Sequence, residues 1–333
     1  MKTEIYGTFG PACDSEGILK EMIEVGMTGM RLNLSHTTLE KSKSIVEKYQ
    51  QAACKMGIRP QILIDMQGPE LRIGKLEKNL ALETGNEIVL GKMENVVQIP
   101  VPQAVIESVE SGDEILLDDG KILVRVTEVI KSKSFSAEVL RGGNLSSHKS
   151  IKVIGKDISL PPLTEHDIAN IKVAKDYGVT ALMQPFVTNG QQLQEVRSVL
   201  KEYGAEHVKI FAKIENRIGV EQIEDILSYA DVIIIARGDL GNDMPLWELP
   251  RVQKQIEEAC HKANKPYIVV TQMLASMEKS PVPTRAEVSD IYHAVYHGAW
   301  GVMLTGETAV GAHPVEAIRY LSNTSKVAKE DRL

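Results

Sequence analysis

Charged side chains follow two neighbouring apolar runs of the sequence at spacings that suit phosphoryl chemistry. Lys213 and Glu215 are two positions apart at the end of the run 208–213, so an extended backbone would point both to the same side. Asp239 follows the next run, in the segment RGDLG. Two carboxylates suit Mg²⁺ or Mn²⁺, ions that keep several waters and accept substrate oxygens. A lysine beside them would supply positive charge where a transferring phosphoryl group spreads its negative charge.

Other runs end in polar residues of the same kind. Arg31, Asn33 and Ser35 alternate along one extended segment, Asp65 ends the next, and Gly238 would let backbone amides approach an anionic carboxylate closely. The remaining polar residues after such runs are His36, Thr271 and Thr305. Each residue alone has an ordinary explanation, since Asp239 could be a turn former and Asn33 or Ser35 a capping group. Their occurrence after six separate runs favours one shared site.

The elements that would position these residues are eight short apolar, β-branched runs, each followed by an amphipathic segment. The runs are residues 3–8, 28–34, 61–66, 179–184, 208–213, 231–236, 266–271 and 300–304. Such alternation is typical of an α/β protein, and we predict a parallel (β/α)8 TIM barrel, whose active site lies where the strands meet the loops that follow them. A doubly wound open sheet is the alternative, because periodicity alone does not distinguish the two.

The alternation is interrupted once, between the third and fourth runs. About a hundred residues there contain short segments typical of antiparallel strands, and Asp119-Gly120 would form the turn of a hairpin. We therefore predict an inserted all-β lid domain over residues 74–157, and a barrel domain formed by residues 1–73 and 158–333. Thr164 and Asp167 have the spacing of a capping box at the start of the following helix.

Composition narrows the class of protein. The formal net charge of −7 argues against a nucleic-acid or anionic-membrane partner, because both require a basic surface. Three cysteines, far apart in sequence, favour reduced thiols over a disulfide framework. The N-terminal residues lack the apolar segment of a signal peptide, and no stretch has membrane-spanning length, so we expect a cytoplasmic protein. The sequence contains no GxxxxGK[ST], GxGxxG or HExxH motif.

The chain resembles the pyruvate kinase family from its first strand to about residue 325. Eight runs occur in the family's order: GTFGPA, GMTGMRLNLSH, GPELRIG, AKIEN, IARGDLG, VTQMLASM, PTRAEVSD and MLTGETAVG. The resemblance implies a TIM-barrel A domain with the inserted B domain as a mobile lid. The chain resembles a short form of the family, because the given sequence does not include the usual C-terminal effector domain. It also implies phosphoenolpyruvate and ADP or ATP as substrates, and the family allows a homo-oligomer formed through the barrel domain.

By this resemblance, Lys213 would stabilise the transferring phosphoryl group, Glu215 and Asp239 would hold Mg²⁺ or Mn²⁺, and Thr305 would help to deliver a proton to the enolate. The residues that would hold phosphoenolpyruvate are Arg31, Gly238, Asp239 and Thr271. Potassium would be surrounded by Asn33, Ser35, Asp65 and the carbonyl of Met66. The nucleotide would be faced by Asn33, His36, Arg72 and Lys149. Glu70 occupies the position at which glutamate, in this family, tends to accompany a requirement for K⁺.

Three functions remain open at this stage. The first is a pyruvate kinase of glycolysis, transferring a phosphoryl group from phosphoenolpyruvate to ADP. The second is a related barrel kinase with another nucleotide or organic acid, because residues 149–155 and 185–188 depart from the family's pattern. The third is a catalytically silent protein that senses phosphoenolpyruvate. Retention of Lys213, Glu215, Asp239 and Thr271 argues against the third function.

Overall fold

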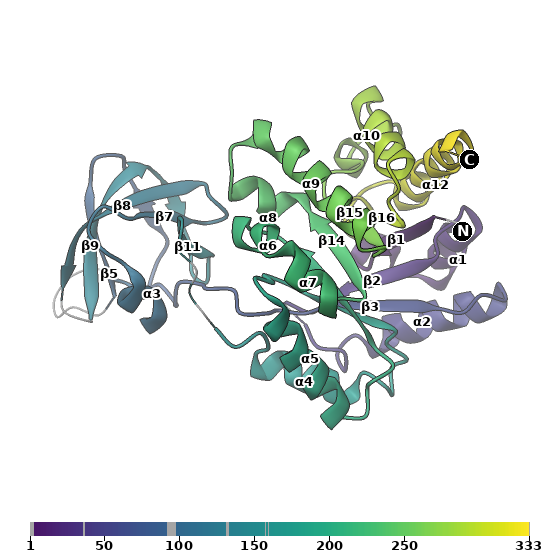
Figure 1. Ribbon diagram of the computed structural model, residues 1–333, viewed down its shortest axis with the longest axis horizontal. Coiled ribbons are helices and arrows are strands. Elements are labelled where there is room, and N and C mark those ends of the chain that lie inside the picture. The colour runs from purple at the N-terminus through teal and green to yellow at the C-terminus, as the bar shows by residue number, and fades with distance from the viewer. Residues whose placement is uncertain are drawn as a thin grey trace. The chain divides into compact units, whose positions relative to one another are not determined.

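The computed structural model describes residues 3–35, 37–91, 98–130, 133–156, 158 and 160–332. The chain divides into two compact units (Figure 1). Residues 1–69 and 161–333 form the first, which we call the barrel unit, and residues 70–160 form the second, the inserted unit. Each unit has its own apolar core, so each is described separately.

The barrel unit is built on eight parallel strands that close on themselves in the order β1-β16-β15-β14-β13-β12-β3-β2. The strands are β1 (Glu4–Thr8), β2 (Gly29–Asn33), β3 (Gln61–Asp65), β12 (Ala181–Gln184), β13 (Lys209–Ile214), β14 (Val232–Ala236), β15 (Tyr267–Val270) and β16 (Gly301–Met303). Seven of the predicted runs contain one strand each, and β13 extends one residue beyond the remaining run, 208–213. The predicted TIM barrel is confirmed, and the pairing of β1 with β16 excludes the open sheet.

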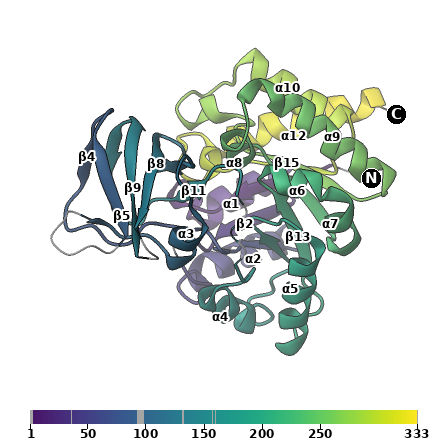
Figure 2. The same cartoon turned by 60° about the vertical axis from the view of Figure 1, so that its left-hand side comes forward.

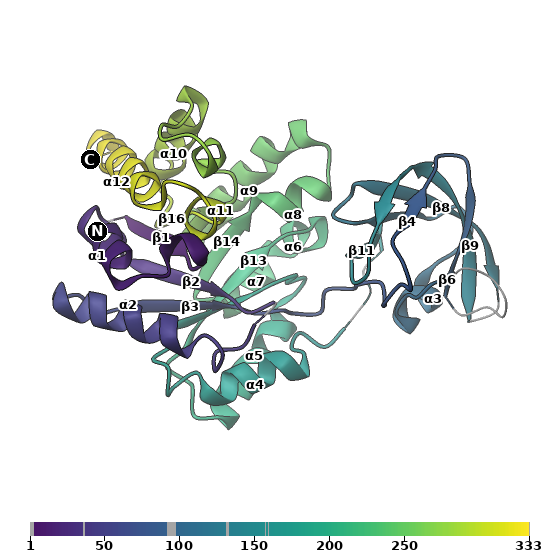
Figure 3. The same ribbon diagram turned by 180° about the vertical axis from the view of Figure 1, so that it is seen from behind.

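Helices surround the barrel and connect its strands (Figures 1 and 3). They are α1 (Glu16–Glu24), α2 (Lys43–Lys55), α4 (Glu165–Val173), α5 (Gly190–Glu202), α6 (Arg217–Glu221), α7 (Ile223–Tyr229), α8 (Arg237–Asn242), α9 (Leu249–Lys262), α10 (Arg285–Tyr296), α11 (Gly306–Ala309) and α12 (Pro314–Arg332). Short 3-10 helices span Pro11–Cys13, Leu246–Glu248 and Ala275–Glu278. The predicted capping box of Thr164 and Asp167 is present at the start of α4.

Two layers of apolar side chains stabilise the barrel unit. Side chains inside the barrel form a core of their own, which includes Tyr6, Met183, Phe211, Ile234 and Ile268. A larger cluster fills the space between the strands and the surrounding helices. Burial of each large aliphatic or aromatic side chain contributes about 1.5–3 kcal/mol to the free energy of folding. Because the eight strands are parallel, their carboxyl ends lie at the same end of the barrel.

The inserted unit is mostly β structure. Its six-stranded sheet has the order β11-β7-β8-β9-β5-β6, and β10 pairs with β4 in a second sheet. The elements are β4 (Leu80–Leu82), β5 (Glu87–Gly91), β6 (Gln98–Ile99), α3 (Gln103–Ser108), β7 (Glu114–Leu117), β8 (Ile122–Ile130), β9 (Ser134–Arg141), β10 (Gly143–Leu145) and β11 (Ile151–Val153). Figure 2 shows β8 beside β9. The predicted hairpin is present, with Asp119 and Gly120 both left-handed between β7 and β8.

Within the described residues, no helix is long and apolar enough to cross a membrane. Cys13, Cys54 and Cys260 are free thiols, which agrees with the expectation from their spacing.

Candidate active site

Four charged side chains meet where β2, β3 and β13 end. Arg31, from β2, contacts Asp65, at the end of β3, through Nη2 and Oδ2 at 2.6 Å. Lys213, near the end of β13, lies between two carboxylates, with Nζ 3.2 Å from Oδ1 of Asp65 and 2.9 Å from Oε1 of Glu215. Asp65 and Glu215 are each only 2% exposed. The barrel therefore brings together four residues that the sequence placed after three separate strands.

Burial and charge act in opposite directions on this cluster. Burial favours the neutral form of Asp65, but the positive charges of Lys213 and Arg31 outweigh it and lower the Asp65 pKa. Burial likewise disfavours the charged form of Lys213, yet Asp65 and Glu215 raise the Lys213 pKa well above its usual value. Lys213 is consequently a buried ammonium whose charged form is favoured by its two carboxylate neighbours. Because burying ion pairs rarely improves stability, this cluster is better explained by chemistry than by folding.

For Glu215, burial outweighs the neighbouring positive charge. Burial raises its pKa, the charge of Lys213 lowers it, and the charge of Asp239 raises it again. The backbone N–H of Phe186 donates to Oε2 of Glu215 at 2.8 Å, and Phe186 itself adopts a left-handed conformation with φ of 54°. Two carboxylates close enough for one to raise the pKa of the other form a donor set for a divalent cation that retains water ligands. Among the described residues, there is no group of three or more His, Cys, Asp and Glu side chains that could by itself hold a metal ion.

A left-handed turn follows β15. Thr271 has φ of 80° and Gln272 has φ of 55°. A β-branched residue rarely adopts this conformation, which costs about 1–3 kcal/mol. The Thr271 side chain lies against Gly238, where an added Cβ would come 3.1 Å from Cγ2 of Thr271. Glycine at 238 therefore allows the first turn of α8 to lie close to Thr271. Gly238 and Thr271, both predicted to bind phosphoenolpyruvate, are thus in contact.

Thr305 is held by Glu307, a carboxylate that was not among the predicted site residues. Oε2 of Glu307 accepts from the Thr305 backbone N–H at 2.8 Å and from the Thr305 hydroxyl at 3.3 Å. Oε1 of Glu307 accepts from the backbone N–H of Leu274 at 3.1 Å. Glu307 is 1% exposed and thus joins the loops after β15 and β16. The sequence signal was the MLTGETAVG run, whose glutamate lies four residues after the end of β16.

The residues predicted to surround potassium are partly brought together. Asn33 and Asp65 are register partners across β2 and β3, and the side-chain oxygen of Asn33 accepts from the Ser35 backbone N–H at 3.1 Å. Met66 is buried directly after Asp65. His36, which was predicted to face the nucleotide, lies outside the described residues.

The two other residues predicted to bind nucleotide, Arg72 and Lys149, belong to the inserted unit. Arg72 donates from Nε and Nη2 to Oε2 of Glu70, at 2.9 and 2.5 Å, and from Nη1 to the carbonyl of His148 at 2.8 Å. Nζ of Lys149 lies 2.7 Å from Oδ1 of Asp118. Both cations therefore have carboxylate partners within their own unit.

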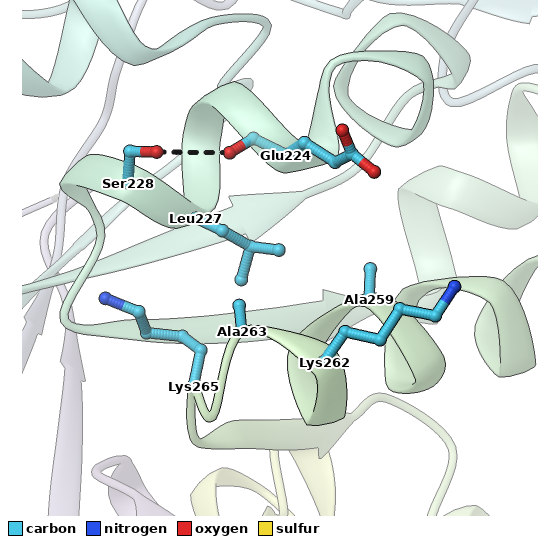
Figure 4. Close-up of a pocket in the computed structure, with 7 residues that line it drawn as sticks. All are labelled: Glu224, Leu227, Ser228, Ala259, Lys262, Ala263 and Lys265. Carbon is cyan, nitrogen blue, oxygen red and sulfur yellow. Dashed lines mark hydrogen bonds between the residues drawn. The ribbon is translucent and has the colours of Figure 1, made fainter.

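A hollow of about 470 Å³ on the outer layer of the barrel unit has a different character (Figure 4). It lies between α7 and the end of α9, beside residues that precede β14 and β15, so it is at the amino ends of the strands. Leu227 and Ala263 point into it, and Nζ of Lys265 donates to the carbonyl of Ala230. The charged cluster at the carboxyl ends is the candidate active site, because this hollow has no convergent catalytic groups.

The fold and this cluster define a (β/α)8-barrel protein whose charged residues gather where barrel active sites lie. The family model for the pyruvate kinase barrel domain matches residues 1–318. The chain belongs to the pyruvate kinase family.

Individual relatives agree. The pyruvate kinase of Bacillus licheniformis is 38% identical over 99% of this chain, and that of Aeropyrum pernix is 38% identical over 98%. The crystal structure of a pyruvate kinase from Cryptosporidium parvum superposes with a TM-score of 0.92 at 33% identity, over 98% of this chain. The alignments cover 57% of the Bacillus licheniformis protein, 70% of the Aeropyrum pernix protein and 69% of the Cryptosporidium parvum chain.

Proposed function

We propose that this chain transfers a phosphoryl group from phosphoenolpyruvate to ADP and so forms pyruvate and ATP. The observation that carries the proposal is the buried ammonium of Lys213, held charged between Asp65 and Glu215 at the carboxyl end of the barrel. A fixed positive charge in a water-poor site stabilises the charge of a transferring phosphoryl group without needing to reorganise.

The residues of the candidate active site have separate proposed parts in the reaction. Arg31, oriented by Asp65, would hold the phosphoryl group of phosphoenolpyruvate, and Lys213 would stabilise that group during its transfer. The backbone amides at Gly238 and Asp239, with the hydroxyl of Thr271, would bind the substrate's carboxylate end. The Thr305 hydroxyl, held by Glu307, would help to deliver a proton to the enolate that remains after transfer. These assignments are supported by the positions of the side chains at neighbouring strand ends.

The carboxylates of Glu215 and Asp239 would hold Mg²⁺ or Mn²⁺. Such an ion, when bound, neutralises phosphoryl oxygens and orients them. The donor set fits, because the charge of Asp239 raises the pKa of buried Glu215, and a cation between the two carboxylates would relieve that repulsion. We further propose that Asn33, Ser35, Asp65 and the carbonyl of Met66 surround K⁺, and that the inserted unit acts as a lid bringing Arg72 and Lys149 to the nucleotide. A cytoplasmic location suits both the free thiols and these substrates.

The experiment that tests the function is an assay of pyruvate formation from phosphoenolpyruvate with a panel of nucleoside diphosphates. We expect turnover with ADP in the presence of Mg²⁺. Turnover only with another diphosphate would favour the related kinase, for which the altered segments 149–155 and 185–188 are the sequence evidence. Binding of phosphoenolpyruvate without turnover of any diphosphate would contradict the proposal and support the silent sensor.

Potassium dependence is a separate expected result. In buffer free of Na⁺ and K⁺, with a bulky organic cation holding the ionic strength, added K⁺ should raise turnover at least about tenfold, because it offsets the negative charges that phosphoenolpyruvate brings to the site. Replacement of Glu70 by lysine should remove much of this dependence, as in family members that carry lysine at that position. The measurement is initial rate against K⁺ concentration.

The control for that charge reversal is Glu77→Lys, which makes the same change at an exposed position of the inserted unit. Its K⁺ response should equal that of the wild type. Full activity of the wild type without K⁺ would show that the monovalent site is wrong and that Asn33 and Ser35 have another role.

A further inference from the structure

The left-handed turn at Thr271 and Gln272 requires something to hold it, because neither residue is glycine. A β-branched residue with φ of 80° persists only where the surrounding structure favours that conformation over relaxed ones. Three residues later, the loop is fixed from the β16 side, where Glu307 accepts from the backbone N–H of Leu274. The turn itself is contacted from the β14 side by Arg237, the first residue of α8.

Arg237 makes a fork of hydrogen bonds around this turn. Its Nη2 donates to the carbonyl oxygen of Thr271 at 2.7 Å, and its Nε lies 3.3 Å from the same oxygen. Nη2 also lies 3.0 Å from Sδ of Met273. Nη1 donates to Asp290, on α10, at 2.8 Å. The Arg237 side chain is 13% exposed, so these partners satisfy most of its donors away from water.

We propose that Arg237, anchored by Asp290, is a positioning residue for Thr271. The guanidinium fixes the orientation of the peptide after Thr271, and this peptide orientation defines the left-handed turn. This left-handed turn places the Thr271 side chain against Gly238, at the start of α8, the helix that contains Asp239. Arg237 thereby keeps the two halves of the phosphoenolpyruvate-binding surface in register, although it acts through Thr271 and not on the substrate. This inference rests on the proposed function.

An arginine elsewhere in the barrel unit forms an ordinary structural ion pair with which Arg237 can be compared. Arg197, on α5, contacts Asp231 at 2.6 Å and donates to the carbonyl of Val208 at 3.1 Å. It thus has the same chemical partners as Arg237, a carboxylate and a backbone carbonyl. Asp231 precedes β14 and Val208 precedes β13, so this pair lies at the amino ends of the strands, opposite the candidate site.

The experiment compares Arg237→Met with Arg197→Met in the full chain. Because a hydrogen bond from a charged group to a buried acceptor is among the stronger ones, we expect Arg237→Met to raise the KM for phosphoenolpyruvate about 10- to 100-fold. The KM for ADP should stay within about twofold, since the turn belongs to the phosphoenolpyruvate side. Asp290→Asn should also raise the KM for phosphoenolpyruvate, but by a smaller factor. Arg197→Met should leave both KM values unchanged, whatever it does to thermal stability.

A second variant tests the turn directly. Glycine adopts a left-handed backbone without strain, so adding Gln272→Gly to Arg237→Met should recover at least about threefold of the lost affinity. Equal KM values for wild type and Arg237→Met, an equal rise in both KM values, or no recovery from Gln272→Gly would each overturn the inference. If Arg237→Met fails to fold, Asp290→Asn and Arg237→Lys carry the test, because lysine's single ammonium cannot reproduce the fork.

The two proposals fail in distinguishable ways. If the wild type shows no turnover with any nucleoside diphosphate, the proposed function is wrong, and calorimetric binding of phosphoenolpyruvate to the same variants still measures the effect of Arg237. If the wild type turns over normally and Arg237→Met binds phosphoenolpyruvate as the wild type does, only the positioning role is wrong.

Discussion

Replacement of Lys213 by methionine is expected to lower kcat by about 10³-fold or more, with a change of less than about threefold in the affinity for phosphoenolpyruvate. The ammonium of Lys213 is buried and paired with two of the protein's own carboxylates, Asp65 and Glu215. Its added contribution therefore arises when charge develops on the transferring phosphoryl group. The measurement is kcat and KM by steady-state kinetics, with substrate affinity checked by calorimetry.

The control is Lys209→Met, which makes the same substitution at the exposed first residue of the same strand. It should leave kcat unchanged. The Lys213 variant also leaves Glu215 buried without its cation, so a stability loss of about 3–5 kcal/mol is expected and thermal unfolding must be measured beside the kinetics. Weakened phosphoenolpyruvate binding with kcat preserved would contradict the assignment, because it would make Lys213 a substrate anchor.

The eight strands of the barrel could be predicted because they depend on patterns that are local in the chain. Each strand is a nearly continuous apolar run, as expected for strands buried on both faces, and turn residues separate the runs. The hairpin around Asp119-Gly120 was predictable for the same reason. Closure of the sheet could not be predicted in this way, because it depends on the pairing of β1 with β16, which no local pattern specifies.

The candidate site could be predicted only as a set of residue types at strand ends. That Arg31, Asp65, Lys213 and Glu215 form one connected ion-pair cluster follows from strand order around the barrel, a property of the whole fold. The supporting contacts were missed for a different reason. The left-handed conformations of Phe186 and Thr271 are imposed by distant partners and leave no signal in their own residue types, since both are unfavourable there. Strained backbone is the feature that local propensity predicts least well.

Replacement of Glu215 by glutamine is expected to lower activity by about 10²-fold or more at ordinary Mg²⁺ concentrations. The amide keeps the size of the side chain and an oxygen that can accept from the Phe186 backbone N–H, so the fold should be retained. What it loses is the negative charge that, beside Asp239, would hold the divalent cation. The measurement is the dependence of the rate on Mg²⁺ concentration, together with direct binding of Mn²⁺ followed by electron paramagnetic resonance.

The matched control for this substitution is Glu257→Gln. Glu257 is 4% exposed against 2% for Glu215, and burial raises the pKa of both carboxyl groups. Glu257 lies on α9, outside the barrel, where Gln253 donates to it at 2.9 Å. Glu257→Gln should therefore bind Mn²⁺ like the wild type, whereas Glu215→Gln should bind it weakly even when saturated with phosphoenolpyruvate. Normal Mn²⁺ binding and near-normal turnover in Glu215→Gln would show that Glu215 is not a metal ligand. The negative charge of Glu215 would then serve only to pair with the ammonium of Lys213.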